Sequence, residues 1–265
     1  MMLRSYYLPP ISVEESEILL MRLTRLRRND AIQDTLLIFE YLPAFAFHHW
    51  ERDQHAIRDQ TAFDSYRAAH NIPLVSAQYR GGGMMYHGPG QIVCAPVIKC
   101  RYGMGIAEYQ KKLGDTSLYA CKTLFGVKAF RVRYDTPSAS WQTEKGDKIS
   151  FSTTNPLGIQ GAWVQDNNEI RKIGFLGFRH SAGVLCHGFA LNLYPGLEAF
   201  RLIDPCNLSG INASSVERIS GIRYEINPTL AQNITALFSK TFNYDAHTFQ
   251  EESLENMLTI KTKNP

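Results

Sequence analysis

The sequence predicts one α+β domain over residues 1–265, in which mixed sheets are flanked by helices. Apolar runs of strand length recur through the middle of the chain, and helical spacing of apolar residues is clearest towards both ends. No internal repeat, low-complexity tract or linker divides the 265 residues. That length suits one large domain or two small ones.

The N-terminal part opens with a helix signal. Ser12 followed by Glu15 is a capping box, and the next leucines recur at helical spacing. Residues 35–40, TLLIFE, predict a buried strand. Residues 44–72 are polar and weakly patterned, which predicts a loop or lid. Three histidines of this stretch are more typical of a solvated loop than of metal ligands, and we predict no metal site; they are His48, His49 and His55.

Strand and helix signals alternate in the middle of the chain. Residues 73–77 and 91–98 predict two strands on either side of a glycine-rich turn. Helical spacing over Ile106–Phe125 is broken by Gly114 and ends at Gly126, as at a helix C-cap. Further strands are predicted at 162–165, 170–178 and 187–193.

Two segments are predicted to lie outside the regular core. Residues 130–160 are rich in Ser, Thr, Gly and Lys, which indicates an exposed insertion, and the polar tail after His247 is expected to fray. Between them, Asn227 and Pro228 form the N-cap and first position of a last helix that runs through Phe242.

The composition is typical of a globular protein with a hydrophobic core, at 44% hydrophobic and 20% charged residues. A net charge of +3 is too small and too scattered to indicate nucleic-acid binding. No apolar run is long enough to cross a bilayer, and no signal-peptide pattern occurs. The first residues are poorer in Arg and Ser than a transit peptide, which leaves organelle import open. The five cysteines contain no C-x-x-C pair, which favours a reducing, intracellular setting over a disulfide framework or zinc site.

The densest functional signal is RGGGMMYHGPGQ, residues 80–91. Three consecutive glycines let the backbone approach a ligand closely and permit positive φ, and Pro89 predicts a second tight turn. Arg80, Tyr86 and His87 could then donate into the space left open. By itself, such a loop more often only turns the chain, and no G-K-[ST] follows it as in a P-loop.

Three later segments contain candidate catalytic residues. Lys172 stands in RKIGFLGFRH, where burial would be costly without a partner and would lower the pKa of the lysine, making it a usable base. A lysine with its amine in water is the commoner arrangement. His187 begins HGFALNL and is more often structural in such a place. Cys206 follows a proline in IDPCNLSG, on a turn, where a thiol can be reactive, although most cysteines are buried and inert.

In this order the four segments resemble those of the lipoyl(octanoyl) transferases. That family has an RGG-x-x-T-Y-H-G-P-G-Q loop, a K-I-x-x-x-G strand, an H-G-x-A-L-N strand and a P-C-G turn. Here they stand as RGGGMMYHGPGQ, KIGFLG, HGFALN and PCN. The likeness extends over residues 12–242, and it implies the mixed sheet and flanking helices of the biotin and lipoate protein ligase catalytic domain.

The resemblance also implies roles by position. Cys206 would carry an acyl thioester, and Lys172 would stabilise its thiolate and move protons. The reaction would transfer an octanoyl group from acyl carrier protein to a lysine of a lipoyl domain, without ATP or any cofactor. Three segments would line the acyl site: Arg80, Gly81, Gly82, Gly83, Met84, Met85, Tyr86 and His87; Phe175, Leu176 and Gly177; and Gly188, Phe189 and Ala190.

The implied acceptors are lipoyl domains of 2-oxoacid dehydrogenase complexes or the glycine cleavage H protein, and a monomer is expected. The divergent loops resemble those of eukaryotic members, which implies a mitochondrial location, with the cytoplasm as the alternative. Two other functions stay open: an ATP-dependent lipoate or biotin ligase, and a repurposed acyl-binding paralogue. HGPGQ and Cys206 favour the transferase.

The chain departs from the family pattern in several places. Met85 replaces a threonine, and the pair before it changes the middle of the loop. Asn207 replaces the glycine after the cysteine, and FHHWERD stands where the family has a Gly-Arg-Arg-like segment. Residues 130–160 have no clear counterpart. These changes bear on substrate choice more than on the chemistry, because Lys172 and Cys206 are both present.

Overall fold

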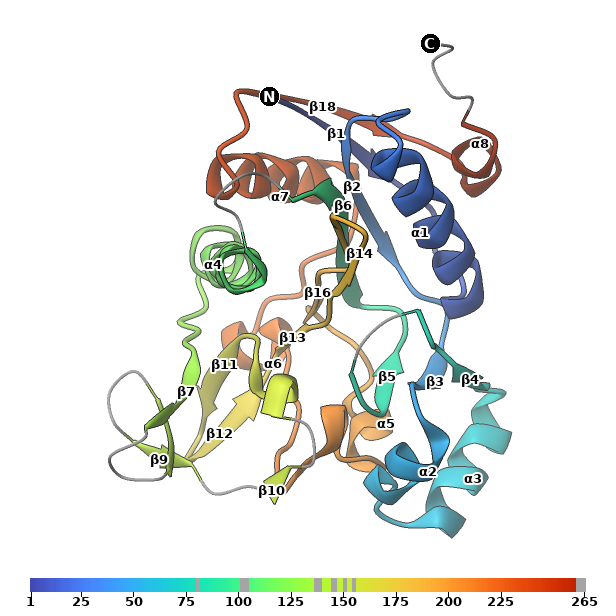
Figure 1. Ribbon diagram of the computed structural model, residues 1–265. Helices are drawn as coiled ribbons and strands as arrows, with labels where there is room; N and C mark the ends of the chain where they lie inside the picture. The colour runs from blue at the N-terminus through green and yellow to red at the C-terminus, as the bar shows by residue number, and fades with distance from the viewer. Residues whose placement is uncertain are drawn as a thin grey trace.

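A mixed sheet forms the centre of the computed structural model, which describes residues 1–79, 82–100, 105–135, 140–143, 147–149, 152–153 and 156–260 (Figure 1). Among these residues the sheet has eight strands, with a main order of β13-β16-β6-β2-β1-β18; β15 also pairs with β6, and β14 with β15. The strands β18, β1 and β2 run parallel, and the other pairs are antiparallel. Their bounds are β1 (Met2–Tyr7), β2 (Asp34–Glu40), β6 (Gln91–Lys99), β13 (Gly174–Leu176), β14 (Arg179–Ser181), β15 (Val184–Cys186), β16 (Phe189–Asn192) and β18 (Ala246–Glu251).

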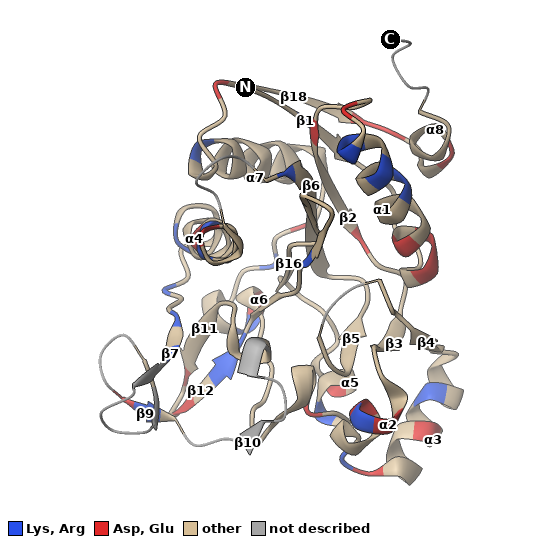
Figure 2. Cartoon of the chain, viewed as in Figure 1, with Lys and Arg blue, Asp and Glu red and all other residues tan. Residues whose placement is uncertain are grey.

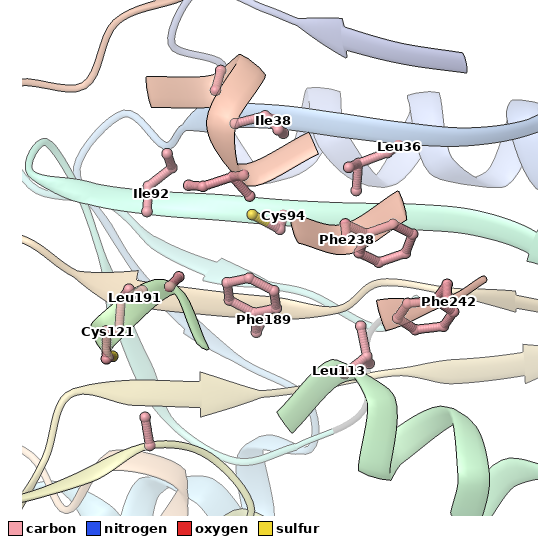
Figure 3. Close-up of a cluster of buried hydrophobic side chains, with 14 of the residues drawn as sticks. Leu36, Ile38, Ile92, Cys94, Leu113, Cys121, Phe189, Leu191, Phe238 and Phe242 are labelled. Carbon is pink, nitrogen blue, oxygen red and sulfur yellow. The ribbon is translucent and has the colours of Figure 1, made fainter. Parts of the chain in front are cut away.

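Helices cover both faces of this sheet because β2 is apolar on both sides. Leu36 and Ile38 pack in one core with α4 (Ile106–Phe125) and α7 (Pro228–Thr241), as Figure 3 shows. The alternate residues Leu37 and Phe39 pack in a second core with α1 (Val13–Arg28). Two buried faces give a continuous apolar run, as in TLLIFE, where a half-exposed strand would alternate.

The helix caps predicted from the sequence are confirmed. Ser12 Oγ accepts from the Glu15 backbone N–H at 3.1 Å, and the Glu15 carboxylate accepts from the Ser12 N–H at 2.7 Å. Asn227 caps α7, and Gly126 ends α4 in the left-handed conformation. The α+β prediction is confirmed as well.

The prediction of a loop or lid over residues 44–72 is wrong. This stretch contains β3 (Ala44–Phe47), α2 (Trp50–Asp53), the short 3-10 helix η1 (Gln54–Ala56) and α3 (Gln60–His70). Strand β3 pairs with β4 (Leu74–Ser76) and β5 (Met85–His87), so the second half of the glycine-rich segment is also a strand. Helix α3 was not predicted because its sequence is mostly polar and Phe63 is its one buried residue.

Three other expectations need correction. Helix α4 continues through Gly114, where the guanidinium of Arg131 occupies the space that a Cβ would need. The predicted strand 170–178 divides at Ile173, because both Ile173 and Gly174 donate to the carbonyl of Ala162 and form a bulge. The tail does not fray before residue 260: β18 pairs with β1, and α8 (Leu254–Leu258) buries Met257 against the α1 side of the core.

The remaining elements lie at the lower end of Figure 1, away from the chain termini. Strand β12 pairs with β11, β17 pairs with β10, and β7-β8-β9 form a small sheet within residues 130–160. Their bounds are β7 (Val132–Asp135), β8 (Ser140–Thr143), β9 (Lys148–Ile149), β10 (Ser152–Thr153), η2 (Pro156–Ile159), β11 (Trp163–Asp166), β12 (Glu169–Lys172), α5 (Leu197–Arg201), η3 (Pro205–Asn207), β17 (Leu208–Ser209) and α6 (Val216–Ser220).

Positions of Lys and Arg and of Asp and Glu are spread along many elements in Figure 2. No helix within the described residues is both long enough and apolar enough to span a bilayer.

Candidate active site

The turn that carries Cys206 is η3, and its backbone is unusual. Cys206 and Asn207 both adopt the left-handed conformation, with φ of 59° and 60°. The Cys206 N–H donates to the carbonyl of Met84 at 2.8 Å, so the turn is attached to the glycine-rich segment. The Cys206 sulfur lies 3.8 Å from that of Met85. The sequence prediction of a turn at this cysteine is confirmed.

Lys172, the last residue of β12, is fully buried. Its ammonium donates to the carbonyl of Gly158 and lies 5.3 Å from the ring centroid of Trp163 and 5.1 Å from that of Phe175. Burial lowers the pKa of Lys172 to about 8, although the nearby Cys206 thiolate acts to raise it. The solvated arrangement is therefore excluded, and the lysine can exchange a proton near neutral pH.

A mainly apolar cavity of about 170 Å³ opens beside the cysteine. The three segments expected to line an acyl site all contribute to its walls: the glycine-rich segment, β13 with the residues after it, and the segment that enters β16. Ten residues expected at the site line it: Gly82, Met85, His87, Phe175, Leu176, Gly177, Gly188, Phe189, Ala190 and Cys206.

The other residues expected at the acyl site either fall outside the described residues or do not line the cavity. Arg80 and Gly81 fall outside the described residues. Gly83 and Met84 contact the cysteine turn. Gly83 lies against the side chain of Asn207, and Met84 forms backbone hydrogen bonds with Asn207 and Cys206. Tyr86 points away from the cavity, with its ring 5.3 Å from that of Phe45 and 5.4 Å from that of Phe200, and burial raises its pKa to about 12.

Several site residues were missed by sequence reasoning. Gly158 and Gln160 lie in the stretch read as an exposed insertion, yet Gly158 bonds to Lys172 and both line the cavity. No residue pattern marks them, because their contribution is a backbone position. The remaining lining residues are Tyr41, Val93, Ala95, Gln110, Phe178 and His187. Val93 and Ala95 lie on β6, a strand whose faces could be read from the sequence only as core.

The other cysteines are in different surroundings. Burial raises the pKa of Cys94 and, to about 12, that of Cys121, both inside the hydrophobic core. Burial also raises the pKa of Cys186, whose thiol lies 3.7 Å from the carbonyl of Arg179. Of the five cysteines, all of which lie within the described residues, only Cys206 lines this cavity.

The site thus combines a thiol, a buried amine and an apolar slot. An ammonium near a thiol favours the thiolate, which is the nucleophilic form. The slot suits an unbranched acyl chain. Among the described residues, no cluster of three or more His, Cys, Asp or Glu side chains gathers to hold a metal ion.

The family model described as the lipoyl protein ligase A/B catalytic domain matches residues 19–239. The chain belongs to the lipoyl protein ligase A/B catalytic-domain family. This match confirms the resemblance drawn from the sequence motifs.

Relatives of this lipoyl protein ligase A/B member include several proteins named octanoyltransferase. The one from Alkaliphilus metalliredigens is 30% identical, over 83% of this chain and 85% of that protein. The mitochondrial octanoyltransferase LIP2 of Arabidopsis thaliana is 26% identical over 93% of this chain and 88% of that protein.

Solved structures with the same fold are lipoate-protein ligases. Lipoate-protein ligase A bound with ATP gives a TM-score of 0.64 at 15% identity, covering 97% of this chain and 93% of that one. A putative lipoate protein ligase from T. acidophilum with bound lipoic acid gives 0.63 at 15% identity, with the same coverage. The predicted ligase-like fold is therefore confirmed.

Proposed function

We propose that this protein is an octanoyltransferase, which moves an octanoyl group from acyl carrier protein to a lysine of a lipoyl domain through a thioester on Cys206. The observation that carries the proposal is the pairing of the fully buried Lys172 with a cysteine that opens onto an apolar cavity. The octanoyltransferase relatives support the same reaction class.

The first half-reaction begins with the Cys206 thiolate, stabilised by the Lys172 ammonium. The sulfur attacks the carbonyl carbon of the donor thioester, the bond from that carbon to the carrier's sulfur breaks, and the carrier leaves as a thiol with the proton that the Lys172 ammonium gives up, which leaves Lys172 neutral. One thioester replaces another, so the step is nearly even in energy and needs no nucleotide. The acyl chain lies in the cavity, with its methylenes against apolar walls such as Phe189 and Ala190.

The second half-reaction uses Lys172 as a base. Acylation removes the negative charge of Cys206, which acts to raise the pKa of Lys172, so the lysine becomes easier to deprotonate. Neutral Lys172 accepts a proton from the incoming lysine amine, which attacks the thioester carbonyl. The bond to the Cys206 sulfur breaks, an amide forms, and the thiolate is restored. Both steps therefore use the same proton-exchanging group in opposite states.

Intact-mass measurement after incubation with octanoyl acyl carrier protein tests the proposal. We expect one added octanoyl group without ATP, and none in Cys206→Ala. Subsequent addition of a lipoyl domain should move the group to that domain. Strict dependence on ATP would instead indicate ligase chemistry, and an adduct in Cys206→Ala would show that another residue is the nucleophile.

The proposed location is the mitochondrion, supported by the likeness to the mitochondrial relative of Arabidopsis thaliana. A tagged full-length chain should be recovered with mitochondria on fractionation. Recovery in the cytosolic fraction alone would contradict this part of the proposal.

A further inference from the structure

Asn207, the residue after the cysteine, joins the catalytic turn to two other segments. Its Oδ1 accepts from the Met84 N–H at 3.0 Å, and its Nδ2 donates to Asp53 Oδ1 at 2.9 Å. The Cys206 N–H donates to the carbonyl of the same Met84 at 2.8 Å. Asn207 and Cys206 therefore bind the backbone N–H and the carbonyl of Met84, respectively.

Asp53 anchors this arrangement from α2. It is fully buried and accepts from the backbone N–H groups of His48 and His49, at 2.8 and 3.1 Å, and from Arg52 Nε at 2.6 Å. Burial by itself would raise the pKa of Asp53, but the hydrogen bonds from Arg52, Asn207 and the two backbone groups outweigh it and lower the pKa. Because an ionised carboxylate only accepts, the amide nitrogen of Asn207 must face it, and the orientation of Asn207 is determined.

The glycine-rich segment is shaped to receive this side chain. A Cβ on Gly83 would lie 2.3 Å from Asn207 Oδ1, so Asn207 occupies the space that a side chain at residue 83 would need. Arg52 also donates to the carbonyl of Gly82 at 2.6 Å, which attaches α2 to the same segment. Gly83, Asn207 and Asp53 thus form one interlocking set, with members from three places in the sequence.

We propose that Asn207, held by Asp53, is a positioning residue that determines where the Cys206 sulfur lies relative to Lys172 and the cavity. The inference rests on the proposed function, since it assumes that Cys206 is the nucleophile. Two consecutive residues in the left-handed conformation are strained unless surrounding bonds maintain them. Without the bonds of Asn207, the turn relaxes and the sulfur moves out of alignment.

Three variants test this role. Asn207→Gly tolerates the positive φ but removes both side-chain bonds, and Asn207→Asp keeps the shape but places a second carboxylate against Asp53. Asp53→Asn keeps the shape of the anchor and removes its charge. We expect each to slow octanoyl-enzyme formation in single turnovers by roughly 10- to 100-fold, with the KM for the carrier little changed. The double variant Asn207→Gly with Asp53→Asn should lose about as much as either single variant, because both changes break one linkage.

Asn227→Gly is the matched control, because this asparagine also accepts a backbone N–H, from Leu230 at 2.9 Å, but caps a helix none of whose residues line the cavity. It should lower stability without slowing acylation. Wild-type rates in both Asn207 variants, or an equal loss in Asn227→Gly, would overturn the positioning role.

Alkylation separates this inference from the proposed function. Iodoacetamide reacts with the Cys206 thiolate and needs no acyl substrate, and peptide mass mapping identifies the modified residue. If the wild-type protein takes no octanoyl group, the proposed function fails, but the positioning role still predicts that Asn207→Gly changes the pH–rate profile of Cys206 alkylation. An unchanged profile would overturn the role in either case.

Discussion

The side-chain nitrogen of Lys172 lies 5.1 Å from the centroid of the Phe175 ring, and that ring is also a wall of the cavity onto which Cys206 opens. The proposed base and the proposed acyl slot therefore share one side chain. The ring faces of Phe175 and Trp163, with the carbonyl of Gly158, surround an ammonium that is shielded from bulk solvent. Such contacts offset part of the cost of burying the charge, by about 2 kcal/mol for a desolvated cation on a ring.

Phe175→Leu should lower the pH at which transfer to the lipoyl domain reaches half its maximal rate. Leucine keeps the surroundings apolar but cannot stabilise the ammonium, so the pKa of Lys172 falls below its value of about 8. The expected change is roughly 1 to 1.5 pH units. Phe178→Leu is the control, because Phe178 lines the same cavity without a ring contact to Lys172. An equal change in both variants would assign the effect to cavity shape.

Lys172→Met should stabilise the protein at pH 7 while abolishing its role as a base. The folded-state pKa of about 8 is below the ordinary value of 10.5, so the unfolded chain binds more protons between these values. Stability of the wild-type protein therefore rises with pH across that window, and below it the buried ammonium costs on the order of 3 kcal/mol. In urea unfolding, the variant should exceed the wild-type protein in free energy of unfolding by less at pH 10 than at pH 7.

The exposed Lys128→Met controls for the loss of one positive charge. If Lys172→Met lowered stability at pH 7, the ammonium would be net stabilising where it lies.

Ala190→Leu should shift the acyl preference towards shorter chains. Ala190 is buried, and leucine adds three carbons to a cavity of about 170 Å³. Loss of room for two methylenes, at about 0.8 kcal/mol each, predicts a roughly 10- to 20-fold lower kcat/KM for octanoyl relative to butanoyl carrier. Ala69→Leu, on an exposed face of α3, should leave the ratio unchanged. An unchanged ratio in Ala190→Leu would mean that the acyl chain lies elsewhere.

Gly90→Ala should destabilise the fold without a direct effect on the chemistry. Gly90 has a φ of 86°, and a Cβ there would lie 2.6 Å from the backbone carbon of Tyr194. Backbone cannot move aside as a flexible side chain can, so we expect a loss of about 2 kcal/mol or more in thermal or urea unfolding. Gly105→Ala meets no atom within 4 Å and should have little effect. Equal stability of the two variants would contradict this role for the second glycine of HGPGQ.

Local signals predicted much of the fold. The Ser12–Glu15 capping box, the Asn227 cap and the apolar run of β2 act over a few residues, so neighbours in sequence carry their information. The 44–72 segment shows the opposite case. Its α3 helix is anchored by Phe63, whose ring centroid lies 4.6 Å from that of Phe45, and by the Asp59 cap. One buried residue in a mostly polar segment is too little to reveal a helix from the sequence.

The sequence by itself determined the family to which the chain belongs, and the order of its motifs predicted Lys172 and Cys206 as the catalytic pair. Only the tertiary structure decided that Lys172 is buried, that the carbonyl of Gly158 accepts a hydrogen bond from its amine, and that Asp53 binds the side chain of Asn207. Burial and hydrogen bonds between distant segments set the pKa of a base and the position of a nucleophile. Neither quantity exists until the chain has folded, since both depend on which atoms replace water around the group.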